Sequence, residues 1–228
     1  MELLEAIKMR HSVRSYTDKK IEGEVLDRLR ETIDECNKSS GLHIQLCLNE
    51  PNAFAPNIIT NMMARYGKFD NVKNYIALVG KKDDSLDEKC GYYGEKIVLK
   101  AQQLGLNTCW VAVTFNKGKS KNAISVKPGE KRLMVIAIGY GSTAGVSHKM
   151  KPIEELSKVN GKMTAWFRNG VEAAKLAPTA MNQQKFRFEL AGDTIRLLPG
   201  SGMYTKVDAG IAKYHFEIGA GDTKWNWA

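Results

Sequence analysis

The sequence lacks the short motifs of several large enzyme classes. It contains no G-x-G-x-x-G dinucleotide-binding turn, no G-x-x-x-x-G-K-[ST] phosphate loop and no G-x-S-x-G nucleophile turn. The four cysteines form no C-x-x-C pair and the four histidines are dispersed, so neither a metal site nor a cysteine–histidine nucleophile pair is indicated. These absences leave a kinase, a hydrolase or a metal-dependent enzyme without support.

No apolar run in the chain is long enough to cross a bilayer. The first residues, MELLEAIKMRHSVRSY, mix acidic and basic side chains and lack the apolar core of a secretory signal. Each cysteine lies in an apolar context, which is typical of buried thiols in a reducing compartment. We therefore expect a cytoplasmic protein that has no membrane partner.

Positive charge is in excess, with a formal net charge of +9 over 228 residues. A charge of this sign suits an anionic partner, such as a phosphorylated cofactor, a nucleic acid or a membrane surface. The basic residues are spread along the chain, however, and none of their runs resembles the basic arm of a nucleic-acid-binding protein. We therefore expect most of them to be solvated surface groups, and we expect no nucleic-acid partner.

Hydrophobic periodicity predicts helices and strands in mixed order. Apolar residues at helical spacing predict helices over 3–10, 22–37, 88–104, 164–176 and 204–218, and another that begins near Pro152. Alternating or continuous apolar runs predict strands over 42–48, 74–80, 108–113, 132–140, 185–190 and 194–198. The segment 49–71 predicts a loop with a helical turn, and 157–164 a short polar linker. This mixture predicts an α+β or α/β layered fold.

Three segments have the composition of a ligand-binding site. RHSVR places Arg10 and Arg14 four residues apart with Ser12 between them, which suits a phosphate, although cations at a helix end can also simply complement its dipole. GLNTCWVAV (105–113) joins a helix to a buried strand, and its amides can face a planar ligand or form a plain core strand. APTAMNQQ (177–184) combines small residues with amides, which suit a flat heterocycle or a surface turn.

Taken together and in order, three segments resemble the nitroreductase family of FMN-dependent oxidoreductases. AIKMRHSVRSYTDKKI is similar to the family's opening R-[RH]-S-[VIT]-R signature. LKAQQLGLNTCWVAVTF is similar to its helix, Gly-Leu-(Gly)-Thr-Cys-Trp segment and buried strand, and AIGY followed by HKMKPIEEL looks like its ending. The resemblance covers most of residues 1–160. It implies an α+β, nitroreductase-like FMN-binding fold, in which helices flank a mostly antiparallel central sheet.

The resemblance also implies which residues bind FMN. The residues that would hold the phosphate and the ribityl chain are Arg10, His11, Ser12 and Arg14. The backbone at Ala112 and Val113, after Trp110, would approach flavin N5 and O4. Lys149 and Lys151 are the candidates for the family's late phosphate-binding residues, although their register against the proline differs from the commonest pattern.

One family motif lies at an unusual place in this chain. The loop P-S-[SAG]-x-N-x-Q-P-W usually follows the second helix and reaches the flavin of the other subunit, but here Leu42 replaces its Asn. APTAMNQQKFRF matches the motif instead, with Phe186 in place of the Trp, as in the putative TM nitroreductase branch with its degenerate second half. The residues that this match adds to the flavin site are Pro178, Thr179, Ala180, Asn182 and Gln184.

This arrangement implies a nitroreductase-like half over 1–160 and a smaller half over 161–228. The two halves would form a monomeric pseudo-dimer with an intramolecular FMN site, or exchange the second half between the chains of a homodimer. The linker 157–164 is short and polar, and the sequence does not choose between these arrangements.

The resemblance implies an enzyme that reduces nitroaromatics, quinones or similar small electron acceptors with NAD(P)H. Hydride would pass through flavin N5 in a ping-pong cycle, so no catalytic side chain is assigned. The loop 52–70, with Phe54, Met62, Met63 and Tyr66, is the predicted substrate wall or, alternatively, a Met-rich core patch. The alternative function is a flavin-binding sensor or carrier without turnover. A nucleic-acid-binding protein that shares the fold is a second rival.

Overall fold

The structure is a computed structural model that describes residues 1–55, 68–116, 118–120, 123–222 and 224–228. It divides into two compact units. Unit 1 consists of Met1–Met9, Asp87–Lys96 and Ser147–Ala228, and unit 2 consists of Arg10–Leu86 and Ile97–Val146. Each unit is thus assembled from segments that lie far apart in the sequence, and the division into halves at residue 160 stays a prediction.

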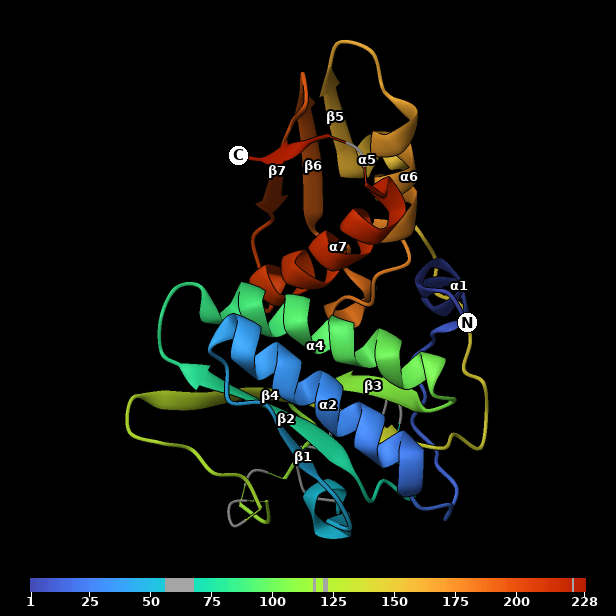
Figure 1. The fold of residues 1–228 in the computed structure, drawn as a ribbon, viewed down its shortest axis with the longest axis vertical. Helices are drawn as coiled ribbons and strands as arrows, with labels where there is room; N and C mark the ends of the chain where they lie inside the picture. The colour runs from blue at the N-terminus through green and yellow to red at the C-terminus, as the bar shows by residue number, and fades with distance from the viewer. Residues whose placement is uncertain (56–67, 117, 121–122, 223) are drawn as a thin grey trace. The chain divides into compact units, whose positions relative to one another are not determined.

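Helices and strands occur in mixed order along the chain (Figure 1). The helices are α1 (Leu3–Met9), α2 (Gly23–Ser40), α4 (Leu86–Gln103), α5 (Ile153–Leu156), α6 (Ala165–Ala174) and α7 (Thr205–Ala220), with 3-10 turns η1 (Pro51–Phe54) and η3 (Ala180–Asn182). The strands are β1 (Gln45–Cys47), β2 (Tyr75–Lys81), β3 (Asn107–Val111), β4 (Glu130–Gly139), β5 (Ser157–Asn160), β6 (Phe186–Ala191), β7 (Thr194–Pro199) and β8 (Asn226–Trp227). The long predicted helices are confirmed, because their ends differ from the predicted ones by at most three residues.

Unit 2 is built on a four-stranded antiparallel sheet in the order β1–β2–β4–β3. The two central strands pair through residues 75–78 of β2 and 134–137 of β4. Both stretches are almost fully buried, as their continuous apolar runs predict for strands that are covered on both faces. β3 lies at one edge of this sheet, so the outer side of its backbone is available for further pairing.

α2 is drawn in front of this sheet in Figure 1 and buries Leu29, Ile33 and Cys36. It ends at Gly41, whose left-handed conformation (φ 71°) lets its N–H donate to the Asn37 carbonyl. The Asn37 carboxamide also accepts from the backbone N–H and donates to the backbone carbonyl of Ile44. Because these bonds occupy the backbone of Ile44, β1 begins only at Gln45, which corrects the longer strand predicted over 42–48.

Unit 1 contains a second four-stranded sheet, in the order β5–β6–β7–β8. β6 and β7 form the predicted hairpin, with Gly192 at φ 61° in its turn. β5 and β8 add to its two sides in parallel. The segment predicted as a linker over 157–164 therefore contains a strand, because pairing with an apolar neighbour such as β6 needs no apolar alternation in the added strand.

Aromatic and glycine contacts hold α6 and α7 against this second sheet. Phe216 of α7 stacks on Phe188 of β6, with 4.6 Å between the ring centroids. A Cβ on Gly170 of α6 would lie 2.6 Å from the Phe216 ring, and one on Gly219 would lie 2.5 Å from the carbonyl oxygen of Asn169. The two helices are therefore packed too closely to admit a side chain at either glycine.

A second close approach joins α7 to the beginning of α4. A Cβ on Gly91 of α4 would lie 2.1 Å from the carbonyl oxygen of Val207. One on Gly210 of α7 would lie 2.1 Å from the carbonyl oxygen of Glu88. Because both obstacles are backbone atoms, which cannot rotate away, the two glycines permit the helices to touch.

The substitution Gly210→Ala is expected to destabilise the protein, because its Cβ would overlap the Glu88 carbonyl and push α7 away from α4. We expect the free energy of unfolding, measured by urea denaturation, to fall by about 1–3 kcal/mol. Gly118→Ala is the matched control, since the nearest atom to its Cβ, Asn116 Oδ1, would be 3.7 Å away. Equal stability of the two variants would contradict the packing argument.

Candidate functional site

The segment that contains RHSVR pairs with the outer edge of β3 in unit 2. Ser12 forms a parallel bridge with Thr108, and the Val13 N–H donates to the Thr108 carbonyl at 3.0 Å. Further along, the Asn107 side chain accepts a hydrogen bond from the Gly141 N–H at 3.0 Å. This pairing places residues 10–14 beside the strand that carries the Thr-Cys-Trp segment.

Three of the predicted phosphate-binding residues gather around the buried thiol of Cys109 in β3. Burial raises the pKa of this thiol, while Arg14, the Ser12 hydroxyl and Arg10 act against the rise. Arg10 is also only 3% exposed. Two guanidinium groups and a hydroxyl thus influence the same thiol, and groups of these kinds are suited to bind a phosphate.

His11 lies in the same segment but contributes no charge at neutral pH. Burial lowers the pKa of its imidazole, and the neighbouring Arg10 lowers this pKa further. The backbone here is tightly packed, because a Cβ on Gly145 would lie 2.7 Å from the Cβ of His11. We therefore expect His11 to act as a neutral hydrogen-bonding group.

The residues predicted to face the flavin ring lie at the end of β3. Trp110 pairs with Ile136 in the sheet, and Val111 is the last residue of the strand. Ala112 is half-buried and Val113 is 37% exposed. The structure thus places the backbone of Ala112 and Val113 outside the sheet, in the same unit as residues 10–14.

The remaining predicted residues form a second group, in unit 1, around the buried carboxamide of Gln184. This side chain is 3% exposed; it donates to the carbonyl of Lys149 at 2.8 Å and accepts from the N–H of Lys151 at 2.9 Å. Asn182 donates to the same Lys149 carbonyl at 2.9 Å, and the Thr179 hydroxyl accepts from the Gln184 N–H at 3.1 Å. Gln184 therefore links the loop 178–184 to residues 149–151.

The loop 178–184 has a strained backbone. Met181, Asn182 and Gln184 have φ values of 51°, 52° and 44°, in the left-handed region that residues with a Cβ mostly avoid. For Met181 and Gln184 this conformation costs roughly 1–2 kcal/mol each. Strain of this kind persists only where the surrounding structure imposes it, and it is concentrated at ligand-binding sites.

Asp208, in the first turn of α7, binds the other side of this loop. Its carboxylate is 2% exposed and accepts from the Ala180 N–H at 2.9 Å and from the Gln183 side chain at 2.7 Å. Burial raises the pKa of Asp208 to about 6, although both hydrogen bonds act against the rise. The sequence patterns did not indicate this residue, whose one available signal is a carboxylate among the apolar residues of the helix, next to Val207.

Comparison with known families identifies the protein's relatives. The sequence profile of the family described as "Putative TM nitroreductase" matches residues 2–220. The chain belongs to this nitroreductase family. A putative nitroreductase from Thermotoga maritima MSB8 has the same fold, with a TM-score of 0.64 and 22% identity over 96% of this chain and 83% of that one.

Other nitroreductase structures cover less of the chain. A nitroreductase-like family protein from Bacillus cereus has a TM-score of 0.52 and 18% identity, over 71% of this chain and 97% of its own. A putative nitroreductase from Desulfovibrio desulfuricans, solved in complex with FMN, has a TM-score of 0.49 and 18% identity over 68% and 94%. No curated protein matches the chain.

The nitroreductase-like α+β fold expected from the sequence is thus confirmed. The roles of the individual site residues stay predictions. That the residues beside β3 and those around Gln184 bind the same flavin also stays a prediction. Of the predicted substrate wall, Met62, Met63 and Tyr66 lie outside the described residues. Phe54 is 8% exposed and packs against Phe69, with 5.1 Å between the ring centroids, so it belongs to the hydrophobic core of unit 2.

Other kinds of site find little support in the described part of this nitroreductase-family chain. Across the residues that the structure describes, no three His, Cys, Asp or Glu side chains are grouped so that they could hold a metal ion. Among the helices formed by these residues, none has the length and apolarity needed to cross a membrane. All four cysteines are buried thiols, as predicted.

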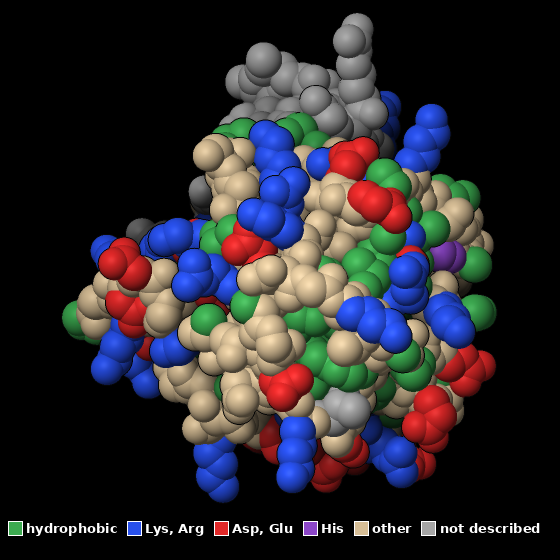
Figure 2. Space-filling view, turned by 90° about the horizontal axis from the view of Figure 1, so that it is seen from above, with side chains coloured by type: hydrophobic (Ala, Val, Ile, Leu, Met, Phe, Trp, Pro, Cys, Tyr) green, Lys and Arg blue, Asp and Glu red, His purple; other side chains and the backbone are tan. Residues whose placement is uncertain are grey.

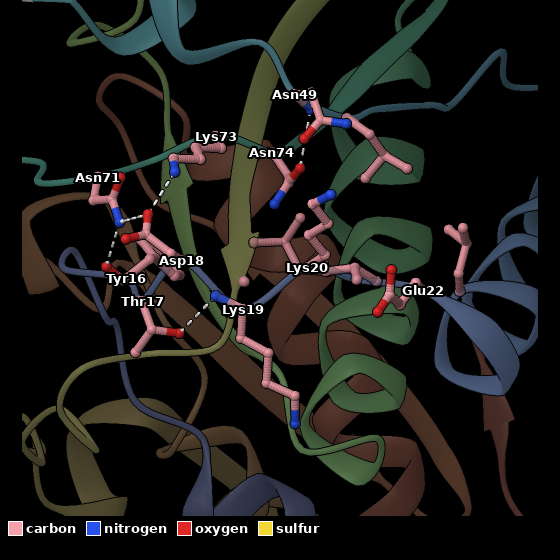
Figure 3. A pocket seen from close by; sticks show the side chains of 15 residues that line it. Tyr16, Thr17, Asp18, Lys19, Lys20, Glu22, Asn49, Asn71, Lys73 and Asn74 are labelled. Atoms are coloured by element: carbon pink, nitrogen blue, oxygen red, sulfur yellow. Dashed lines mark hydrogen bonds and ion pairs between the residues drawn. The ribbon is translucent and has the colours of Figure 1, made fainter.

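Unit 2 also contains a cavity of about 220 Å³, which the sequence did not indicate (Figure 3). The segment 16–22 forms one wall, and residues near the strand ends form the other. Asp18 accepts hydrogen bonds from Lys73 and Asn71, which lower the pKa of its carboxyl. These three polar side chains hydrogen-bond to one another, so they already have partners within the protein. We therefore assign no ligand to this cavity.

The raised pKa of Asp208 predicts a pH-dependent stability. The folded protein binds this proton more tightly than the unfolded chain, in which the pKa of Asp is about 3.9. Its stabilising effect is therefore complete below about pH 4 and is lost as the pH rises through about 6. Relative to Asp208→Asn, the wild type should lose about 2–3 kcal/mol of unfolding free energy between these limits.

Urea denaturation at a series of pH values measures this difference. Asp222→Asn, which makes the same chemical change at an exposed residue beyond the end of α7, should follow the wild type. A difference between wild type and Asp208→Asn that does not change with pH would show that the proton on Asp208 is bound equally in the folded and unfolded states.

Proposed function

We propose that this nitroreductase-family chain is a flavin-dependent oxidoreductase that binds FMN and uses NAD(P)H to reduce a small electron acceptor, such as a nitroaromatic or a quinone. The observation that carries the proposal is the gathering of Arg10, Ser12 and Arg14 around Cys109 beside β3. The donor set fits the phosphate of FMN, because a phosphate monoester has three strong acceptor oxygens and about two negative charges at neutral pH.

Each residue of this cluster has its own part in the proposal. Arg10 and Arg14 supply positive charge and planar, fork-shaped donor groups, which match phosphate oxygens in pairs. Ser12 supplies a hydroxyl, and neutral His11 a further hydrogen bond. The cluster requires no proton transfer, because bound FMN supplies the redox chemistry and the chain supplies binding, orientation and exclusion of water.

The loop 178–184 and Lys149 have a supporting part in the proposal. The carboxamides of Asn182 and Gln184 already bond to the protein, so we assign to them the shape of the loop. Pro178, Thr179 and Ala180 are half-buried, and we assign contact with the ligand to the exposed surface of this stretch. Lys149 uses its carbonyl within the loop, and its side chain is exposed.

The distribution of charge favours a discrete anion site over a nucleic-acid surface. On the face that Figure 2 shows, Lys and Arg side chains are interspersed with Asp and Glu. A nucleic-acid-binding protein gathers its cations in a stripe or patch that follows the phosphate backbone. This face therefore gives no support to a nucleic-acid surface.

An absorbance spectrum of the purified protein tests the function. The protein is mixed with FMN, passed over a sizing column and then treated with NADH or NADPH. Retained flavin bands that bleach support the oxidoreductase, and retained bands that do not bleach support a flavin-binding sensor or carrier. If the protein retains no flavin, the proposed function is wrong.

Arg14→Ala is expected to weaken FMN binding without unfolding the protein, because the half-buried side chain would lose a charge-assisted hydrogen bond. Such a bond contributes about 1.5–3 kcal/mol, so the dissociation constant should rise roughly 10- to 100-fold. Titration of FMN fluorescence measures it. Arg30→Ala, on the exposed surface of α2, is the control, and an Arg14→Ala variant that binds like this control would remove Arg14 from the site.

A further inference from the structure

The strained loop 178–184 is attached to unit 1 on two sides. On one side, Gln184 and Asn182 bond to the backbone of residues 149–151, which form no helix or strand. On the other side, Asp208 belongs to α7, a helix of 16 residues with most of its length buried. Asp208 therefore provides the attachment that comes from a rigid element.

The carboxylate of Asp208 spans the strained part of the loop. One oxygen accepts from the N–H of Ala180 and the other from the side chain of Gln183. These donors flank Met181 and Asn182, two of the three residues with left-handed backbone. The Gln183 amide also donates to the Met203 carbonyl at 3.1 Å, so its nitrogen is directed by two acceptors at once.

We propose that Asp208 is a positioning residue, which holds the loop 178–184 in its ligand-binding conformation through the negative charge of its carboxylate. Only a carboxylate offers two acceptor atoms to two donors in this arrangement. The consequence for the cofactor rests on the proposed FMN function, whereas the geometry rests on unit 1 alone.

The charge of Asp208 changes near neutral pH, because burial raises its pKa and the two groups that hydrogen-bond to it are neutral. Its pKa of about 6 results from burial, opposed by hydrogen bonds from Ala180 and Gln183. Lys206, the cation nearest to it along α7, is exposed. Three pairs join ionisable groups of α7 to the packed part of α4: Glu88 with Lys213, Glu95 with His215, and Glu217 with Tyr92. The other charged residues in this part of α4 are half-buried: Asp87, Lys89 and Lys96. Beside the loop, Lys185 donates to the Ser201 carbonyl.

The loop should therefore become better ordered as the pH rises through about 6, since the ionised carboxylate is the stronger acceptor. Global stability is expected to change in the opposite direction, because the ionised form is the less stable one in this buried position. A residue that only filled space in unit 1 would not produce opposite changes in loop order and in stability.

Amide hydrogen exchange of the flavin-free protein, followed by NMR, tests the proposal. In Asp208→Asn, the protection of the Ala180 amide should fall about tenfold, because the bond to the Gln183 side chain is lost and the loop opens more often. The protection of Val171 in α6 should change only by the difference in global stability between the two proteins. In the wild type, the Ala180 amide resonance should titrate with a midpoint near 6, and this titration should disappear in the variant. Asp222→Asn is the matched control and should behave like the wild type.

Gln183→Ala keeps the test informative if Asp208→Asn does not fold, because it removes one of the two bonds from the loop side and leaves α7 unchanged. It too should reduce protection of the Ala180 amide. Unchanged protection in Gln183→Ala, or an Ala180 resonance that does not titrate in the wild type, overturns the proposal.

These experiments distinguish a failure of the proposed FMN function from a failure of the role proposed for Asp208. If the wild type retains no FMN but the exchange results hold, the FMN function fails and the positioning role of Asp208 stands. If FMN is retained and loop protection is unaffected by Asp208→Asn, the positioning role fails alone. When both hold, FMN binding should weaken in Asp208→Asn.

Discussion

The backbone contact between α4 and α7 is the constraint on which the packing of unit 1 depends. Gly91 and Gly210 let the two helices approach until a Cβ on either glycine would overlap a carbonyl oxygen of the other helix. This contact joins residues 87–96 to a segment more than a hundred residues later in the sequence. Because α7 also stacks Phe216 on the second sheet, the helix is fixed on two sides and its first turn has a defined position.

A fixed first turn is what permits Asp208 to bind a strained loop. A carboxylate on a mobile element would take up whatever conformation its partners prefer, and the loop would relax out of the left-handed region. Here the helix fixes the position of the carboxylate, so the loop adopts the conformation in which the Ala180 N–H and the Gln183 amide can both donate to it. Gln184 completes the attachment from the opposite side through residues 149–151. The conformation of the loop is thus a consequence of packing elsewhere in unit 1.

Local sequence patterns predicted much of the fold but few of the contacts in the group of residues around Gln184. Apolar periodicity indicated the long helices, and continuous apolar runs indicated β2 and β4, because burial on both faces is visible in the sequence. The length of β1 could not be predicted from the sequence, since it depends on hydrogen bonds between the Asn37 side chain and the backbone of Ile44. The strand β5 could not be predicted either, because it has no apolar pattern of its own. RHSVR could be identified from its charges, whereas Asp208 lies 28 residues from Ala180 in the loop that it holds, and its one local signal is a carboxylate in an apolar helix.

The chemistry of Asp208 explains why an acid is required at a position where it lowers stability. At neutral pH the carboxylate is ionised and buried, which costs the folded state free energy that a neutral side chain would not cost. An asparagine would accept from the Ala180 N–H, but its own NH₂ would then face the NH₂ of Gln183, and two donors cannot bond to each other. Two donors that converge from one loop need two acceptors on one side chain, and aspartate at this distance provides both. The loss of stability therefore has a specific cause, which is the geometry of a strained loop at a proposed binding site.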